Sequence, residues 1–358
     1  MSTRIAVIGV GLIGGSVALA AKQRLDATLT GFDRSADALA TGRRRGALDH
    51  LSDSVADAVA DAEAVFVAVP VGALPEAVAK VLEAAPGDCV ITDVGSTKRA
   101  IVASQVDPRF VGGHPLAGAE TAGVEHARAD LFDGATWYLT PTANTSGLLY
   151  ERLHRLLHAL GASPSAIDPD AHDRMLATVS HLPHVLANVL VSQAAQTLAV
   201  DAERLPATGP SFRDATRVAG ASSEVWTDIY LSNRDALAAQ IEEAIGRLRS
   251  VRSALIAGDP DRIAAWNDTA GTDRRRLLEA QLAGGPLFEL RASVPNRPGV
   301  IAQLALELGR AGVNIVDMAL YPAVDMTEGV VALWIAGEPQ AGRAHELIGK
   351  LGFPVARA

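Results

Sequence analysis

The 358-residue sequence predicts an α/β fold with a doubly wound sheet, followed by an all-α region and a small α+β domain. Over residues 1–145, short apolar runs alternate with helical patterns, which is typical of a parallel sheet covered by helices. Over 146–283, apolar residues recur at three- and four-residue spacing, which indicates helices. Over 286–358, the order becomes strand, helix, strand, strand, helix, which indicates a small open sandwich. The chain is long enough for each region to have its own core.

The first strand and its turn indicate a nucleotide-binding loop. The run RIAVIG (4–9) is apolar and β-branched, and G-V-G-L-I-G then leads into a helix. The first glycine permits a tight turn, the second lets the backbone approach a pyrophosphate, and the third lets the helix pack close to the strand. Amides at the helix N-terminus then face the phosphates. The predicted phosphate-binding residues are Gly9, Gly11, Leu12, Ile13 and Gly14. The sequence therefore predicts a Rossmann-type domain; a turn without a ligand and an N-terminal signal peptide are the alternatives.

The next strand, TLTGFD (28–33), ends in an acidic residue that bears on cofactor choice. Asp33 lies 19 residues after Gly14, where a carboxylate binds the ribose 2′-hydroxyl and repels a 2′-phosphate. This favours NAD. Arg34 follows directly and could hold a 2′-phosphate, so NADP stays open. Val69 and Pro70, at the end of the strand AVFVAVP, are expected beside the cofactor.

Further strands and helices continue the alternation. Strands are predicted at 64–70, 89–94, 109–113 and 136–140, with helices at 35–45, 54–61 and 73–85. Ligands of such sheets bind beyond the carboxyl ends of the strands. Pro70, Asp93, Ser96 and His114 all follow strand ends, so we expect them to share one crevice.

Several of the remaining polar residues have a structural and a chemical interpretation. His114 lies in VGGHPLAGAE (111–120), where it could be a general base or a loop histidine bonded to backbone. Ser96 in DVGSTK could act at the same site or cap a helix.

The helical region offers two further candidate groups. His181 and His184 in SHLPH are expected on one helix face, and a metal site with His172 and Asp173 is an alternative without a recognised ligand pattern. In FRDATRVAG (212–220), arginines suit a carboxylate-bearing substrate, or they form an exposed charged face.

The strings DVGSTK, GGHPLAGAE, HDRMLATVSHLPH, FRDATRVAG and EVWTDIYLSN, in this order over about residues 1–280, resemble the prephenate/arogenate dehydrogenase family of tyrosine biosynthesis. The resemblance implies oxidative decarboxylation of prephenate to 4-hydroxyphenylpyruvate, or of arogenate to tyrosine, with hydride transfer to NAD. It implies that His114 is the catalytic base, assisted by Ser96 at the ring hydroxyl. It also implies a homodimer and a set of substrate-site residues: His184, Arg217, Glu120, Arg213 and Asp214.

The last region resembles an ACT domain, an amino-acid-sensing module, over about 287–357. The turn N-R-P-G-V and the segment G-V-N-I match the usual ligand positions, which implies regulatory roles for Asn296, Gly299 and Asn314. Tyrosine is the first effector to expect. An ACT domain that serves structure or dimerisation alone is the alternative.

Composition narrows the remaining possibilities. A net charge of −9 without a long basic run disfavours nucleic acid and anionic membranes as partners. Cys89 is the single cysteine, which is typical of a reducing cytoplasm and excludes an intrachain disulfide. We expect a small-molecule substrate and no metal. A related dehydrogenase with another substrate and an amino-acid-binding regulator with a degenerate dehydrogenase half are the competing hypotheses.

Overall fold

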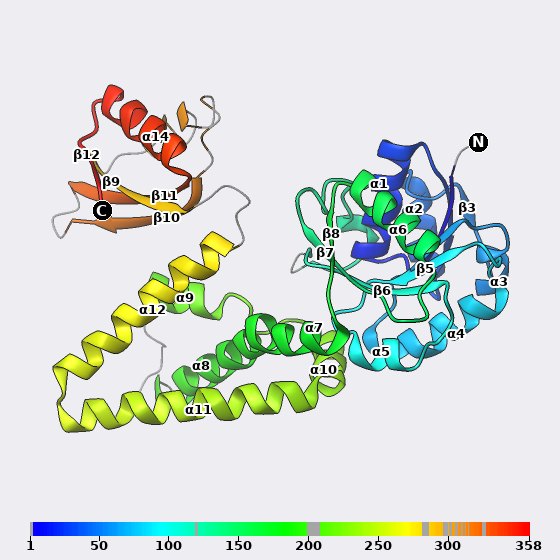
Figure 1. Ribbon diagram of the computed structural model, residues 1–358, viewed down its shortest axis with the longest axis horizontal. Helices are drawn as coiled ribbons and strands as arrows, with labels where there is room; N and C mark the ends of the chain where they lie inside the picture. Colours follow the sequence, from blue (N-terminus) through cyan, green and yellow to red (C-terminus); the bar gives the residue numbers. More distant parts are fainter. Residues whose placement is uncertain are drawn as a thin grey trace. The chain divides into compact units, whose positions relative to one another are not determined.

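The computed structural model describes residues 3–118, 121–198, 208–280, 286–295, 300, 303–304, 307–308, 311, 313, 315–323 and 327–358 (Figure 1). Contacts divide the chain into two units, Met1–Ile245 and Gly246–Ala358, and each is described by itself. The predicted regulatory residues Asn296, Gly299 and Asn314, and the predicted substrate-site residue Glu120, lie outside the described residues.

The first unit contains an eight-stranded sheet in the order β3-β2-β1-β4-β5-β6-β7-β8. The strands are β1 Arg4–Ile8, β2 Thr28–Phe32, β3 His50–Leu51, β4 Ala64–Val67, β5 Val90–Asp93, β6 Phe110–Pro115, β7 Thr136–Thr140 and β8 Ser163–Ala166. All neighbours are parallel except β6 and β7. The strand order reverses at β1, which is where a doubly wound sheet binds its ligand.

Helices cover both faces of this sheet. They are α1 Leu12–Leu25, α2 Ala36–Arg44, α3 Val55–Val59, α4 Leu74–Ala84, α5 Arg99–Ala103 and α6 Gly147–Ala159, with short 3₁₀ turns η1 Val71–Ala73 and η2 Val124–His126. In β1, Ile5 and Val7 join the core that includes α1 and α6, whereas Ala6 and Ile8 join the core that includes α3, α4 and α5. Strands buried on both faces explain the continuous apolar runs in the sequence.

The six strands predicted here are present, and β3 and β8 are additional. β3 is two residues long, and β8 reads SPSA without a β-branched residue, so neither has a strand signal. β7 runs antiparallel to β6, which departs from a purely parallel sheet. Because β8 pairs with β7, the elements of this sheet continue to Ala166.

The helical region consists of α7 Pro169–Leu176, a π-turn η3 Ala177–His181, α8 Leu182–Leu198, α9 Pro210–Thr216, α10 Ser223–Ser232, α11 Arg234–Ala257 and α12 Pro260–Ala280. The predicted helix 222–257 is in fact two helices, because the buried Asn233 ends α10. Pro183 lies in the first turn of α8, directly after the π-turn, and the helical stretch continues through it.

The second unit contains a small four-stranded antiparallel sheet in the order β10-β11-β9-β12. Its described elements are β9 Leu287–Pro295, β10 Ile315–Pro322, β11 Glu328–Ala336, α14 Glu338–Lys350 and β12 Val355–Arg357. The predicted helix over 300–312 falls partly outside the described residues. Apolar residues of β9, β11 and α14 form one core. The described residues of this unit therefore form a small antiparallel sheet that shares a core with α14.

Candidate active site

The glycine loop after β1 has the geometry that a dinucleotide pyrophosphate needs. Gly9 has φ +98°, and a Cβ on it would lie 2.4 Å from the Ala68 carbonyl oxygen. A Cβ on Gly14 would lie 2.0 Å from the Gly9 carbonyl oxygen, so the third glycine is needed for close packing. Gly11 is the N-cap of α1 and supplies no side-chain cap. The first-turn amides, those of Leu12 and Ile13 among them, are thereby left to bind an anion.

Asp33 follows β2 with its carboxylate held beside this loop. The backbone N–H of Val10 donates to Asp33 Oδ2 at 2.7 Å, and that of Ser35 donates to Oδ1 at 2.8 Å. The predicted ribose-binding residue is thus fixed against the phosphate loop. Arg34 is exposed directly after it, while Val69 and Pro70 lead from β4 into η1.

Two glycine substitutions separate folding from cofactor binding. We expect Gly14→Ala to destabilise the fold, because the added methyl overlaps the backbone of Gly9. Gly11→Ala meets no atom within 4 Å, so its fold should persist while NADH binding weakens about tenfold or more through lost backbone approach. Thermal unfolding and NADH fluorescence titration of both variants measure this. Equal NADH affinity for Gly11→Ala and the wild type would contradict the assignment of the loop.

His114 lies near the end of β6, in a strand that two glycines allow to pack tightly. A Cβ on Gly112 would lie 2.4 Å from Thr140 Oγ1, and one on Gly113 would lie 2.5 Å from Thr92 Oγ1. The His114 side chain is buried, and its Nδ1 lies 2.9 Å from Nε2 of His172 on α7. The predicted base is therefore held by a second imidazole rather than by backbone.

His172 in turn contacts a carboxylate. Its Nδ1 lies 2.8 Å from Asp173 Oδ1. The backbone N–H groups of Lys98 and Arg99, at the start of α5, donate to Asp173 Oδ1 and Oδ2 at 2.7 and 2.9 Å. Burial raises the pKa of Asp173, but the hydrogen bonds from His172 and the two amides outweigh it and hold the pKa below its ordinary value. Asp173 is therefore ionised at neutral pH.

A buried ion pair lies beneath the same turn. Lys98 Nζ donates to Asp93 Oδ2, and both side chains are fully buried. Asp93 also accepts hydrogen bonds from the backbone N–H groups of Gly95 and Gly113, at 2.8 and 3.0 Å. The carboxylate thus joins the turn that carries Ser96 to the strand that carries His114.

The surroundings of His114 keep it neutral. Burial is the largest cause that lowers its pKa well below the ordinary value of 6.5, and the neighbouring groups His172, Lys98 and His181 lower it further. A neutral imidazole can accept a proton.

The activity should respond to pH accordingly. A base acts only when it is unprotonated, so kcat/KM should be constant near pH 7 and decline only as the pH falls below 6.5 toward the lowered pKa of His114. A pH–rate profile from pH 4.5 to 9 measures this. An acidic limb centred at pH 7 or above would show that His114 is not the titrating base.

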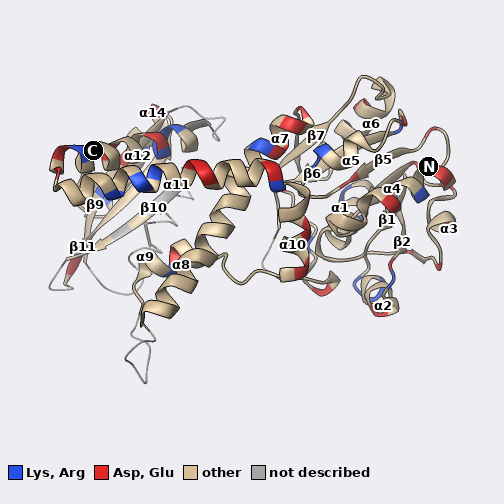
Figure 2. Cartoon of the chain, turned by 90° about the horizontal axis from the view of Figure 1, so that it is seen from below, with Lys and Arg blue, Asp and Glu red and all other residues tan. Residues whose placement is uncertain are grey.

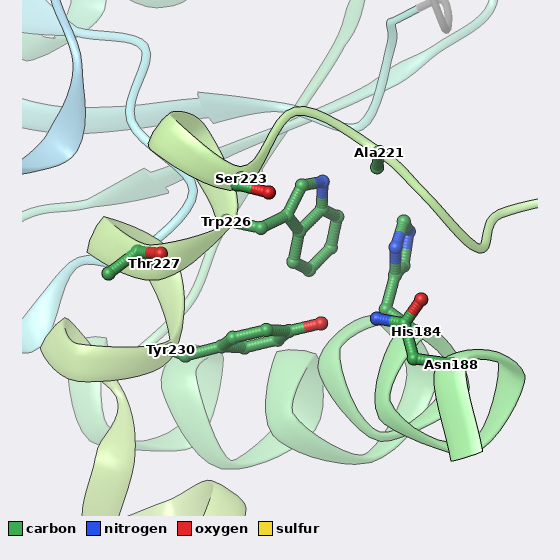
Figure 3. Close-up of a pocket in the computed structure, with 7 residues that line it drawn as sticks. All are labelled: His184, Asn188, Ala221, Ser223, Trp226, Thr227 and Tyr230. Atoms are coloured by element: carbon green, nitrogen blue, oxygen red, sulfur yellow. The ribbon is translucent and has the colours of Figure 1, made fainter. Parts of the chain in front are cut away.

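A pocket of about 120 Å³ lies between α8 and α10 (Figure 3). The His184 ring stacks on the Trp226 ring with centroids 3.5 Å apart, and Figure 3 shows Tyr230 and Asn188 beside them. Burial, and secondarily Arg217, lowers the pKa of His184. The charge of Arg217 therefore reaches the His184 imidazole, which lines this pocket.

The pocket is linked to His114 through buried side chains. His181 lies with its ring 6.0 Å from that of Trp226, and its Nδ1 is 3.2 Å from Asn233 Nδ2. Asn233 Nδ2 also donates to the Asp173 carbonyl oxygen at 2.7 Å. Burial is the main cause that lowers the pKa of His181, to about 4, so this imidazole is neutral.

The structure places the predicted residues in two groups. His114, Ser96 and Asp93 lie at the carboxyl edge of the sheet, whereas His184 lines the pocket and Arg217 is exposed at the end of α9. Arg213 and Asp214 are exposed on α9. Among the described residues, no three His, Cys, Asp or Glu side chains are arranged to hold a metal ion.

Sequence reasoning missed the role of His172 and Asp173 as partners of His114, and it missed Lys98, Asn233 and Trp226. A His-Asp dipeptide at the start of a helix is a weak signal of a base with its orienting carboxylate. The signal becomes specific only once the fold is known, because His172 lies 58 residues after His114 in the sequence and contacts it only in three dimensions.

The fold and the site together define an NAD-dependent dehydrogenase. Two family models match the chain: prephenate dehydrogenase, nucleotide-binding domain, over 17–165, and prephenate dehydrogenase, dimerization domain, over 168–268. The prephenate dehydrogenase of Bacillus subtilis is 32% identical and covers 97% of this chain and 96% of its own length.

Solved structures agree with this assignment. Prephenate dehydrogenase from Aquifex aeolicus, in complex with hydroxyphenyl propionate and NAD⁺, has a TM-score of 0.72 at 26% identity and covers 77% of this chain and 99% of its own. Synechocystis arogenate dehydrogenase has a TM-score of 0.67 at 26% identity, covering 77% of this chain and 100% of its own. The chain belongs to the prephenate dehydrogenase family.

Proposed function

We propose that this protein catalyses the NAD-dependent oxidative decarboxylation of prephenate to 4-hydroxyphenylpyruvate, or of arogenate to tyrosine. The observation that carries the proposal is the buried, neutral His114, positioned at the carboxyl edge of a dinucleotide-binding sheet. Both substrates are cyclohexadienols that carry a ring hydroxyl, a ring carboxylate and a charged side chain. Each therefore needs a base for the hydroxyl and a cation for a carboxylate.

The residues fit a bound NAD⁺, which supplies the hydride acceptor. The open space over Gly11 and the uncapped start of α1 suit the pyrophosphate, and Asp33 suits an unphosphorylated ribose. His114 accepts the proton of the ring hydroxyl as that oxygen becomes ketone-like, and returns a proton to it when the ring becomes a phenol. Ser96 donates to the same oxygen. Loss of the ring carboxylate as CO₂ makes the ring aromatic, which drives the reaction.

Substrate binding is assigned to the pocket side. Arg217 binds a substrate carboxylate, since a guanidinium offers two parallel N–H donors to it. His184 lines the site, and Arg213, Asp214 and Glu120 belong to an ionic network at its mouth. The closeness of Arg217 to His184 supports this assignment.

One initial-rate experiment tests the reaction. Prephenate and arogenate are each combined with NAD⁺ and with NADP⁺, and the appearance of reduced nicotinamide is followed with and without tyrosine. We expect turnover with NAD⁺ and at least one of the two substrates. Folded protein that binds NADH and turns over neither cyclohexadienol would overturn the proposal and favour an amino-acid-binding regulator.

A homodimer formed through the helical region is part of the proposal. Helix α8 contains no Lys, Arg, Asp or Glu (Figure 2), and among its residues Val189 and Leu190 are 53% and 42% exposed. The stretch Pro169–Leu198 is the one described helix long and apolar enough to span a membrane, and 22% of its most apolar window is buried. The family model for a dimerization domain covers this stretch, which supports a second copy as its cover. Light scattering should give twice the chain mass, and Val189→Glu should lower it.

The last region is proposed to be an ACT domain that senses an amino acid, tyrosine first. Its strand order and antiparallel pairing support the open-sandwich architecture. If Asn296, Gly299 and Asn314 form the effector site, Asn296→Ala should reduce inhibition by tyrosine without changing uninhibited turnover.

We assign the protein to the cytoplasm because of its single cysteine. The division into domains 1–145, 146–283 and 286–358 stays a prediction.

A further inference from the structure

We infer that His172 and Asp173 form a positioning dyad that holds the proton of His114 on Nδ1, so that Nε2 is the atom that accepts the substrate proton. This inference rests on the proposed function for its catalytic consequence. Its structural part stands on the hydrogen bonds among the three side chains and the start of α5.

The first step is the state of Asp173. Among the described residues, the partners of its carboxylate are the Lys98 and Arg99 amides, which donate to it, and His172 Nδ1. These hydrogen bonds hold the pKa of the carboxyl below its ordinary value against the effect of burial. The carboxylate is therefore ionised and accepts, which places a proton on His172 Nδ1.

The second step is the state of His172. Its side chain is fully buried, and the cationic Lys98 lies in the same buried network. We assign His172 the neutral tautomer with the proton on Nδ1, facing the carboxylate, so that its Nε2 is an acceptor. Since His172 Nε2 faces His114 Nδ1 at 2.9 Å, the proton between them belongs to His114. A neutral His114 then has its lone pair on Nε2.

The third step is the effect on proton transfer. When the O–H bond of the substrate breaks, its proton forms an N–H bond with His114 Nε2, and His114 becomes a cation. The cation keeps its Nδ1–H bond to His172, and the charge of Asp173 lies one imidazole away. No proton has to leave the dyad. The arrangement orients the base and stabilises its charged form, as an Asp does directly in a serine-hydrolase triad.

The dyad also fixes the base relative to the hydroxyl-binding turn. The same carboxylate that orients His172 accepts from the amides at residues 98 and 99, directly after Ser96 and Thr97. Asn233, between α10 and α11, donates to the Asp173 carbonyl. Asp173 therefore links three features: the imidazole that orients His114, the turn after Ser96, and the boundary between α10 and α11.

Two substitutions of His172 test the inference. His172→Leu removes the acceptor, whereas His172→Gln places an amide oxygen where Nε2 was, so that it can still accept from His114 Nδ1. We expect His172→Leu to lower kcat about 100-fold, within the range of general-base effects, with KM and NADH affinity changing little. His172→Gln should recover about a tenth of the wild-type kcat or more. Equal kcat for His172→Leu and the wild type would overturn the inference.

A spectroscopic measurement separates positioning from structure. In protein with ¹⁵N-labelled histidine, ring nitrogen shifts report which nitrogen carries the proton, and His114→Asn identifies the His114 signals. We expect His114 to be protonated on Nδ1 in the wild type and in His172→Gln, and to change to the Nε2–H form in His172→Leu. His154→Leu, at an exposed histidine on α6, is the matched control. A wild-type His114 protonated on Nε2 would also overturn the inference.

The two proposals fail in different ways. The ring nitrogen shifts are recorded without substrate, so they hold even if neither cyclohexadienol is turned over. In that case the reaction assignment falls and the dyad stands. If prephenate or arogenate is turned over but the His172 variants show wild-type kcat and shifts, the dyad falls and the reaction stands.

Discussion

His114→Asn is expected to lower kcat by about 10²- to 10⁴-fold, the range found for removal of a general base. Asparagine fits the space of the buried imidazole and can still contact His172, so the sheet and the cofactor loop should be preserved. What it lacks is a nitrogen lone pair able to accept the hydroxyl proton. Steady-state kinetics, NADH titration and thermal unfolding of the variant measure the three effects separately.

The control for this substitution is His154→Asn on α6, which removes an exposed imidazole. It should leave kcat at the wild-type value. Full activity of His114→Asn would show that another group takes the proton, and the mechanism would be wrong.

Asp93→Asn is expected to cost about 3–5 kcal/mol of unfolding free energy, because it leaves the fully buried Lys98 without its counter-charge. The substitution also turns one of the two carboxylate oxygens, which accept from the backbone N–H groups of Gly95 and Gly113, into an NH₂ group that cannot accept. Urea unfolding measures the loss. Adding Lys98→Met to Asp93→Asn removes the unpaired cation and should recover part of the stability.

The comparison is the exposed pair Lys80–Glu76 on α4, four residues apart. Glu76→Gln should cost far less unfolding free energy than Asp93→Asn, because exposed helix pairs contribute little. If Asp93→Asn costs no more than Glu76→Gln, the buried pair does not hold the turn.

Much of the fold could be predicted because its signals are local. The glycine spacing, the doubly buried strands and Asp33 each lie within a few residues of what they predict, and the structure confirms a doubly wound sheet at these positions. The antiparallel direction of β7 has no such signal, since strand direction depends on the path of the intervening chain. The break of the long predicted helix at Asn233 depends on burial, which composition does not show.

The candidate site could be predicted only in part for a related reason. The sequence predicts His114 directly after a strand, and this places it at the ligand edge; in the structure it lies within the last residues of β6. Its partner His172 comes from the helical region, and the contact depends on how α7 packs on α5. The stacking of His184 on Trp226 likewise joins two helices that the sequence treats separately.

The π-turn Ala177–His181 has a consequence for the angular phase of the helical stretch. His172 and His184 are 12 residues apart, and on an unbroken α-helix they would point about 120° away from each other. A π-turn holds one extra residue, which subtracts about 100° and brings the two imidazoles to nearly the same side. If the same residues formed one continuous α-helix without the π-turn, the two histidines would no longer point the same way. The backbone geometry of this turn, and not only the identity of its residues, therefore joins the predicted base to the pocket.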